Sequence, residues 1–226
     1  MGKLVCIGGG EIPRNKNGII LPYETEEIDK EIVKLSEKSN PKLLFIGTAS
    51  SHSEEYFDVI KDIYTKLGCI VSNLDIINNN FDTEMLENII FDTDIIYVGG
   101  GNTRFMLEKW RECGLDKILK QAYEKNIVLS GLSAGSYCWF KYNYNLIEGV
   151  GLIDAINCVH YDIKDEESKN KFYKTLKDKN MIGYAIDNCV ALEFIDNQVK
   201  VIKSNQKRNA YKVVYLNGDI IEEIIQ

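Results

Sequence analysis

The turn that decides the fold reads Leu129-Ser130-Gly131-Leu132-Ser133-Ala134-Gly135-Ser136, between an apolar run, Ile127–Leu129, and a helix-capable run, Tyr137–Phe140. Its Gly-x-Ser-x-Gly pattern predicts a tight strand-to-helix turn, because glycine on both sides of Ser133 leaves room for the backbone to pass. A serine placed there projects its hydroxyl from the top of a sheet. The next amide, that of Ala134, then begins a helix and can stabilise an oxyanion. The alternative is a turn of small residues without chemistry, and the preceding buried strand favours the nucleophile.

Short apolar, β-branched runs alternate along most of the chain with longer segments that carry apolar residues every three or four positions. Nearly continuous apolar runs are typical of strands buried on both faces of a parallel sheet. We predict strands at Lys3–Ile7, Lys42–Ile46, Ile70–Ile77, Asp94–Val98 and Ile127–Leu129, and helices at Glu26–Lys38, Glu54–Leu67, Thr83–Ile90, Thr103–Glu112 and Leu115–Lys125. This alternation predicts an α/β fold with a doubly wound, mostly parallel sheet and helices on both faces.

The pattern changes in the last fifth of the chain, where short strand-like runs are separated by turn residues. These runs predict antiparallel strands at the edge of the sheet, at Gly183–Ile186, Val190–Phe194, Gln198–Lys203 and Tyr211–Leu216. The turns between them are Asp196-Asn197, the basic stretch 203–208, which we expect to be a solvated hairpin, and Asn217-Gly218. Because no repeat or Pro-rich linker interrupts the chain, we expect residues 1–226 to form a single domain.

Composition narrows the class of partner. A net charge of −7 argues against nucleic acid and anionic membrane, since both attract basic surfaces. The six cysteines are scattered without the paired spacing of a zinc site, so we expect no metal or organic cofactor. The chain starts directly with a strand, without the pattern of a signal peptide, and no apolar run approaches the length of a membrane helix. We therefore expect a cytoplasmic protein that acts on a small molecule, and a homodimer is compatible with the sequence.

A serine nucleophile needs a base, and the chain has two histidines, His52 and His160. His160 follows the Ser133 turn in chain order and ends a short apolar run. His52 lies in a polar loop just before a predicted helix, where a structural role is the simpler interpretation. His160 is therefore the predicted general base.

A second glycine turn, residues 99–103, reads Gly-Gly-Gly-Asn-Thr and joins another apolar strand to another helix. The amides of Gly100 and Gly101 can point at an anion. Asn102 or Thr103 can equally cap the helix, and the two roles are compatible. The turn lacks the Lys-Ser/Thr of a P-loop, which argues against nucleotide binding. A third run, 8–10, has no further glycine at dinucleotide-binding spacing and predicts only a tight turn.

Taken in order, the glycine turn 99–103, the Ser133 turn and the pair His160-Tyr161 resemble peptidase family S51, over nearly the whole chain. That family includes aspartyl dipeptidase (peptidase E) and cyanophycinase. Its fold is related to class I glutamine amidotransferases, with serine in place of their cysteine. The resemblance implies that Ser133 is the nucleophile and His160 the base, and that the amides of Gly101 and Ala134 form the oxyanion hole. We assign Gly100 and Asn102 to substrate binding.

The resemblance also implies an acidic third member of the triad between the serine turn and the histidine. This segment looks shorter here than in peptidase E. Glu148 is the predicted acid, because it follows the turn at a similar offset. The open alternatives are Asp154, Asp162 and Asp187.

These residues predict a serine-type peptidase that hydrolyses short peptides through an acyl-enzyme. One alternative keeps the chemistry but changes the substrate, as in an esterase or an amidase. Another is a catalytically silent member that binds a small molecule in the same cleft. A glutamine amidotransferase would need cysteine at position 133.

Overall fold

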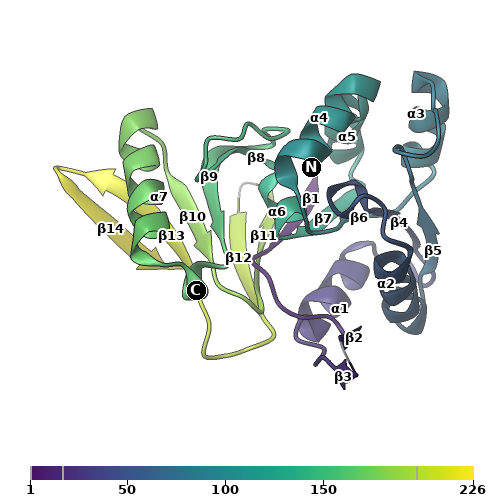
Figure 1. Ribbon diagram of the computed structural model, residues 1–226, viewed down its shortest axis with the longest axis horizontal. Coiled ribbons are helices and arrows are strands. Elements are labelled where there is room, and N and C mark those ends of the chain that lie inside the picture. The colour runs from purple at the N-terminus through teal and green to yellow at the C-terminus, as the bar shows by residue number, and fades with distance from the viewer. Residues whose placement is uncertain (1, 17, 197) are drawn as a thin grey trace.

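The computed structural model describes residues 2–16, 18–196 and 198–226. Its larger sheet has seven strands (Figure 1), in the order β12 (Gln198–Lys203), β11 (Val190–Ile195), β1 (Lys3–Ile7), β7 (Val128–Leu132), β6 (Ile95–Val98), β4 (Lys42–Ile46) and β5 (Ile70–Asn73). The strands from β1 to β5 in this order run parallel, whereas β11 and β12 add an antiparallel edge. The predicted α/β class, with a mostly parallel sheet and antiparallel edge strands, is confirmed. Of the four runs predicted at this edge, Val190–Phe194 and Gln198–Lys203 lie there, whereas Gly183–Ile186 and Tyr211–Leu216 belong to another sheet.

Helices cover both faces of this sheet, and the faces follow the alternation of side chains along β1. Val5 and Ile7 pack with α1 (Glu26–Leu35) and α2 (Glu54–Lys66). Leu4 and Cys6 point to the other face, in the cluster that includes α3 (Thr83–Phe91), α4 (Thr103–Cys113) and α5 (Leu115–Glu124). Both faces of the strand are thus buried, as its unbroken apolar sequence predicts.

A second sheet, not expected from the sequence, lies beside the first (Figure 1). Its order is β14 (Asp219–Ile224), β13 (Ala210–Leu216), β10 (Gly183–Ile186), β9 (Ile153–Val159) and β8 (Phe140–Asn143). Strands β8, β9 and β10 run parallel, and β13 and β14 are antiparallel. One face packs against α7 (Glu166–Lys179), through Phe172 and Leu176. A small hairpin, β2 (Asn15–Lys16) with β3 (Ile19–Ile20), completes the strands of the described residues.

The structure corrects three sequence-based expectations. The basic stretch before β13 is not a hairpin, because it connects two strands of different sheets. The run Tyr137–Phe140 is helical only at Tyr137, where the short α6 (Ala134–Tyr137) ends, and β8 begins at Phe140. The predicted strand 70–77 stops at Asn73, because the Asp75 side chain accepts hydrogen bonds from two following amides and forms a turn.

The turn at Asn217-Gly218 is confirmed, since it joins the antiparallel pair β13–β14 with positive φ at both residues. The other predicted turn, Asp196-Asn197, includes Asn197, which lies outside the described residues. No helix in the described ranges has both the length and the apolar character that crossing a membrane requires.

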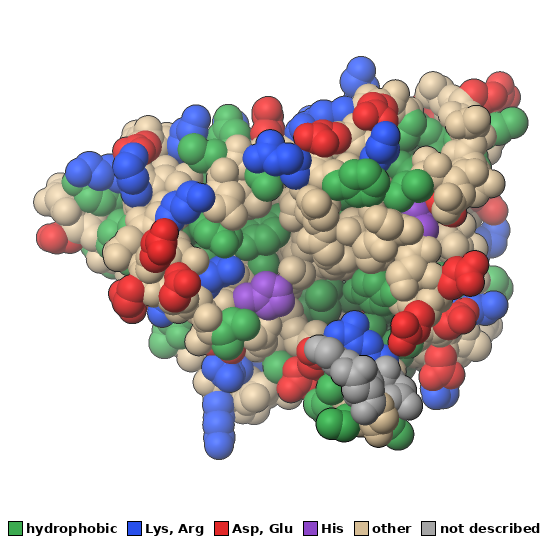
Figure 2. All heavy atoms as spheres, viewed as in Figure 1, with side chains coloured by type: hydrophobic (Ala, Val, Ile, Leu, Met, Phe, Trp, Pro, Cys, Tyr) green, Lys and Arg blue, Asp and Glu red, His purple; other side chains and the backbone are tan. Residues whose placement is uncertain are grey.

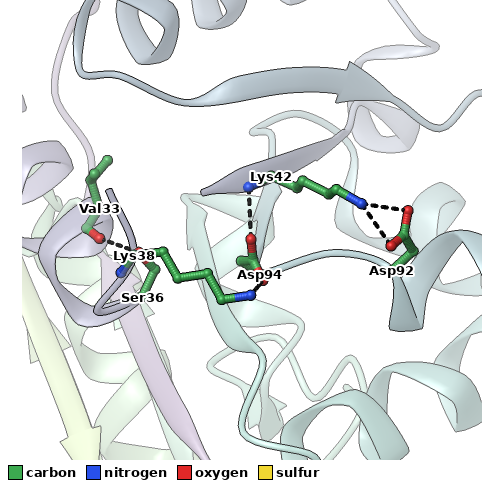
Figure 3. A network of polar contacts seen from close by, with 6 residues as sticks. All are labelled: Val33, Ser36, Lys38, Lys42, Asp92 and Asp94. Carbon is green, nitrogen blue, oxygen red and sulfur yellow. Dashed lines mark hydrogen bonds and ion pairs between the residues drawn. The ribbon is translucent and has the colours of Figure 1, made fainter. Parts of the chain in front are cut away.

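A network of polar contacts ties the amino ends of two neighbouring strands to the loop after α1 (Figure 3). Asp94, just before β6, accepts the backbone amide of Lys42 at 2.8 Å and pairs with Lys38 at 2.5 Å. Lys42 reaches Asp92 at 2.7 Å. Exposed pairs of this kind stabilise a fold by at most about 1 kcal/mol each. The network thus lies at the end of the sheet opposite the carboxyl ends of these strands.

Candidate active site

Ser133 lies on a strained turn between β7 and α6. Its φ of 56° and ψ of −106° are unusual for a residue with a side chain. Its amide donates to the carbonyl of Ile7, and its own carbonyl accepts from Tyr137. A Cβ on Gly131 would lie 2.4 Å from the Gly135 oxygen, and one on Gly135 would lie 2.1 Å from the Val98 oxygen. The turn therefore requires glycine at both flanking positions.

His160 faces Ser133 from the carboxyl end of β9. The Nε2 atom of its ring lies 2.8 Å from the Ser133 Oγ. The Nδ1 atom lies 2.7 Å from the Oδ1 atom of Asn188. The backbone amide of His160 donates to the Gly8 carbonyl at 3.0 Å, and a φ of 54° turns the residue out of the strand. Ser133, His160 and Asn188 thus form a continuous hydrogen-bonded chain.

The partners of the ring determine which nitrogen carries the proton. An amide oxygen can only accept, so Nδ1 carries a proton and donates it to Asn188. Nε2 then has a free lone pair, which accepts the Ser133 hydroxyl. This is the tautomer that can act as a base toward the serine.

The three residues meet where the two sheets join. Ser133 follows β7 of the larger sheet, His160 follows β9 of the second, and Asn188 lies in the loop from β10 to β11. Because β9 and β10 are parallel with Val159 opposite Ile186, their carboxyl ends deliver His160 and Asn188 to the same place. Gly9, after β1, lies against both: a Cβ there would be 2.1 Å from the Asn188 Oδ1 and 2.3 Å from the His160 Nδ1.

A cleft of about 550 Å³ opens over Ser133 and His160. Figure 2 shows a hollow on this face beside a histidine side chain. Tyr56, Val59 and Leu132 contribute apolar walls. The charged lining residues are Glu11, Arg14 and Glu55, and Arg14 pairs with Glu11 at 2.9 Å. The volume is in the range of small-molecule sites, and the lining carries charges of both signs.

Backbone amides stand next to the serine. The Gly100 amide is occupied, since it donates to the Tyr56 hydroxyl at 3.2 Å. Burial raises the pKa of Tyr56, so this oxygen stays a neutral phenol. The hydrogen bonds among the described residues give no acceptor to the amides of Gly101 and Ala134. Both amides are therefore free to donate to a ligand.

The model of peptidase family S51 matches residues 4–202. The chain belongs to peptidase family S51. Its relatives include the uncharacterized peptidase YgaJ of Bacillus subtilis strain 168, 29% identical over 98% of this chain and 96% of the relative. The uncharacterized peptidase PM1590 of Pasteurella multocida is 26% identical over 74% of this chain and 87% of its own length.

Solved structures show the same fold. A peptidase from an acI-B1 Actinobacterium superposes with a TM-score of 0.74 and 20% identity, over 99% of this chain and 96% of the other. A putative peptidase E protein from Listeria monocytogenes EGD-e gives 0.67 and 20%, over 90% and 98%. Membership of family S51 supports assignment of the chain as a hydrolase of peptidase type.

In this S51 chain the predicted acid, Glu148, does not reach the histidine, and that expectation is wrong. Glu148 is exposed in a separate surface depression, together with Arg111 and Lys141. Its backbone is held there, because it forms a β-bridge across the bend that follows β8 and its carbonyl oxygen accepts a hydrogen bond from Arg111. Asp154, one of the alternatives, pairs with Lys141 on the same surface.

The other two alternatives lie near the site without touching the ring. The Asp187 carboxylate accepts the backbone amide of Asn209, and burial raises the pKa of Asp187. Asp162 contacts Asn188 rather than His160. The partner of the ring is therefore a neutral amide, Asn188, which a search for carboxylates passes over. A signal for it was present, since Asn188 follows the carboxyl end of a predicted strand, where site residues of α/β sheets gather.

The predicted substrate-binding pair and the second histidine are placed differently. Gly100 lines the cleft, although its amide is already occupied. Asn102 is exposed outside the cleft lining, and its Oδ1 caps α4 by accepting from Phe105 at 3.1 Å, so the capping alternative is the one found. The His52 side chain is buried away from Ser133, with Nε2 3.5 Å from Thr48 and from Asp75. Within the described ranges, no group of His, Cys, Asp or Glu is arranged to hold a metal ion.

Proposed function

We propose that this S51 member is a serine-type peptidase that cleaves short peptides through an acyl-enzyme. The observation that carries the proposal is the contact of 2.8 Å between the Ser133 Oγ and the His160 Nε2, with the other ring nitrogen held by Asn188. This arrangement has the roles of a hydrolase triad, with an amide as the orienting group.

In the proposed reaction, His160 takes the hydroxyl proton as the Ser133 Oγ attacks the scissile carbonyl carbon. The amides of Gly101 and Ala134 donate to the oxyanion that forms. His160 then gives its proton to the leaving amine, the C–N bond breaks, and the acyl group stays on Ser133. Water, activated by the same ring, attacks the ester and releases the acid.

The cleft supports a short peptide as the substrate. Its volume, about 550 Å³, suits a ligand of a few residues. The Arg14–Glu11 pair presents a guanidinium that can also meet a carboxylate, and Glu55 offers an anion to an ammonium group. These charges complement a small zwitterion better than an uncharged ester, which favours peptides over simple esters as substrates.

The decisive experiment is labelling with a fluorophosphonate probe and mapping of the modified residue. We expect the label on Ser133, and we expect Ser133→Ala to lose labelling and peptide hydrolysis by roughly 10³-fold or more without loss of fold. Ser50→Ala is the matched control, because Ser50 also lines the cleft but donates its hydroxyl to the Gly47 carbonyl.

A wild-type protein that neither takes the label nor turns over any member of a dipeptide panel would contradict the proposal and favour a silent binding protein. Faster turnover of aryl esters than of every peptide would favour the esterase alternative.

A further inference from the structure

A buried carboxylate lies directly behind Asn188. The Asp162 side chain is 4% exposed, and its Oδ1 accepts the backbone amide of Asn188 at 2.8 Å. Its Oδ2 is 3.4 Å from the Asn188 Nδ2 and 2.8 Å from a guanidinium nitrogen of Arg208. Asp162 does not contact Ser133 or His160, so the proposed reaction has so far given it no part.

The contacts of Asp162 settle the direction of the Asn188 amide. A carboxylate that pairs with Arg208 and a backbone amide acts as an acceptor, so the NH₂ group of Asn188 is the end that faces Asp162. The oxygen end of the amide then faces His160, where it accepts the Nδ1 proton at 2.7 Å. If the amide were reversed, its NH₂ group would face Nδ1, and the ring would move its proton to Nε2. Ser133 would then have no base.

We propose that Asp162 is a positioning residue that, through Asn188, holds His160 in the basic tautomer, so that the pair Asp162–Asn188 does the work of a single triad carboxylate. The inference rests on the proposed function for its catalytic meaning. It also adds a charge effect, because a carboxylate bonded to the NH₂ end of an amide polarises the amide and makes its oxygen a stronger acceptor.

Neighbouring groups hold the Asp162 side chain in place. Arg208, from the connection between the two sheets, neutralises its outer oxygen. Asp187 is nearby, and burial, followed by the repulsion from Asp162, raises the pKa of Asp187. Burial raises the pKa of Cys189 to about 11, so this thiol is neutral next to Asp162. Two further charged groups act on these neighbours, Lys169 on Asp187 and Glu24 on Cys189.

The test is an exchange of the two side chains. In Asp162→Asn, the new amide still accepts the backbone amide of Asn188, but its NH₂ group meets the NH₂ group of Asn188 and favours the reversed amide. We expect kcat to fall by roughly 10- to 100-fold, the scale for losing an outer-shell partner, with little change in KM. We also expect the acid limb of the kcat/KM profile to move to lower pH, because the imidazolium loses a negative charge that is hydrogen-bonded to its own partner, Asn188.

Asn188→Asp alone places two carboxylates against each other and should also lower kcat. The double variant Asp162→Asn/Asn188→Asp restores one carboxylate and one amide in contact, and we expect its kcat to exceed that of both single variants. Recovery of this kind tests contact between the two side chains, so it remains decisive even if Asp162→Asn alone folds poorly. Asp187→Asn is the control for a neighbouring charge without contact to Asn188, and its acid limb should stay in place.

A spectroscopic readout separates this inference from the proposed function. The ¹⁵N signals of His160, identified by their absence in His160→Ala, should show the neutral ring protonated on Nδ1 in the wild type and a shift toward Nε2 protonation in Asp162→Asn. If Asp162→Asn shows this shift but the wild type takes no fluorophosphonate label, the proposed function alone is overturned. An active wild type with an unchanged tautomer in Asp162→Asn, a double variant no better than the singles, or an equal movement of the acid limb in Asp187→Asn would overturn the role of Asp162.

Discussion

Gly9 is a position where one added methyl group should disturb the contact between His160 and Asn188 directly. It has a φ of +152°, and a Cβ built there lies 2.1 Å from the Asn188 Oδ1 and 2.3 Å from the His160 Nδ1. An ordinary contact needs 3.4 Å or more. In Gly9→Ala, the amide and the ring must therefore move by more than an ångström in total, and the hydrogen bond of 2.7 Å between them is broken.

The expected cost follows from the role of that hydrogen bond. Misplacing a reacting group by about 1 Å lowers the rate on the order of 10²-fold, and losing the correct histidine tautomer lowers kcat by as much as about 10⁴-fold. We expect kcat/KM of Gly9→Ala to fall between these limits, mainly through kcat, because His160 is the one lining side chain that the added Cβ meets among its nearest atoms. Steady-state kinetics on the best dipeptide substrate, together with the rate of fluorophosphonate labelling, would measure the loss.

The control is Gly114→Ala, at a helix end where φ is +77° and no atom lies within 4 Å of the added Cβ. This change introduces backbone strain without a collision, so we expect a lower Tm and unchanged kcat/KM. Wild-type kinetics in a folded Gly9→Ala protein would refute the reasoning, because the contact between His160 and Asn188 would then be irrelevant to the reaction.

Three further outcomes are expected. His160→Ala should lose roughly 10³-fold or more in kcat, whereas His52→Ala should affect mainly the Tm; equal kinetic losses would point to misfolding. Asn188→Ala should lower kcat strongly, while Glu148→Gln should leave it unchanged, and the reverse order in the same assay would restore Glu148 as the acid. Burial raises the pKa of Asp29 from 3.8 to about 6, so its folded form holds a proton that the unfolded chain releases. The free energy of unfolding should thus fall by about 3 kcal/mol as pH rises from about 4 to above 6. In urea unfolding, Asp29→Asn should show a smaller change of this free energy with pH, and an equal change in the variant and the wild type would rule this out.

Much of the larger sheet could be predicted from local sequence. The strands Lys3–Ile7 and Lys42–Ile46 have the predicted bounds, and the helices differ from prediction by a few residues at their ends. The Ser133 turn could be predicted for the same reason, since it depends on residues within a few positions of one another. Periodicity and glycine spacing report local conformation, and here local conformation agrees with the fold.

The third member of the site could not be predicted in this way. Asn188 contacts His160 because β10 pairs with β9 in a separate sheet, and strand order is set by packing between distant segments. The sequence gives no local mark of that pairing, and a lone amide after a strand has many ordinary explanations. The interpretation of Glu148 failed on the same point: an offset along the chain says little about distance once the chain bends at β8 and forms a second sheet.

Local sequence was enough to predict a serine on a tight turn after a buried parallel strand, and a histidine at the end of a later strand. The groups that hold this histidine emerge from tertiary contacts, because the roles of Gly9, Asn188 and Asp162 depend on loops from two sheets. Local backbone conformation depends on residues a few positions apart, so it can be recognised as a pattern in the sequence. A contact between side chains 26 or more positions apart exists only after packing has brought their strands together.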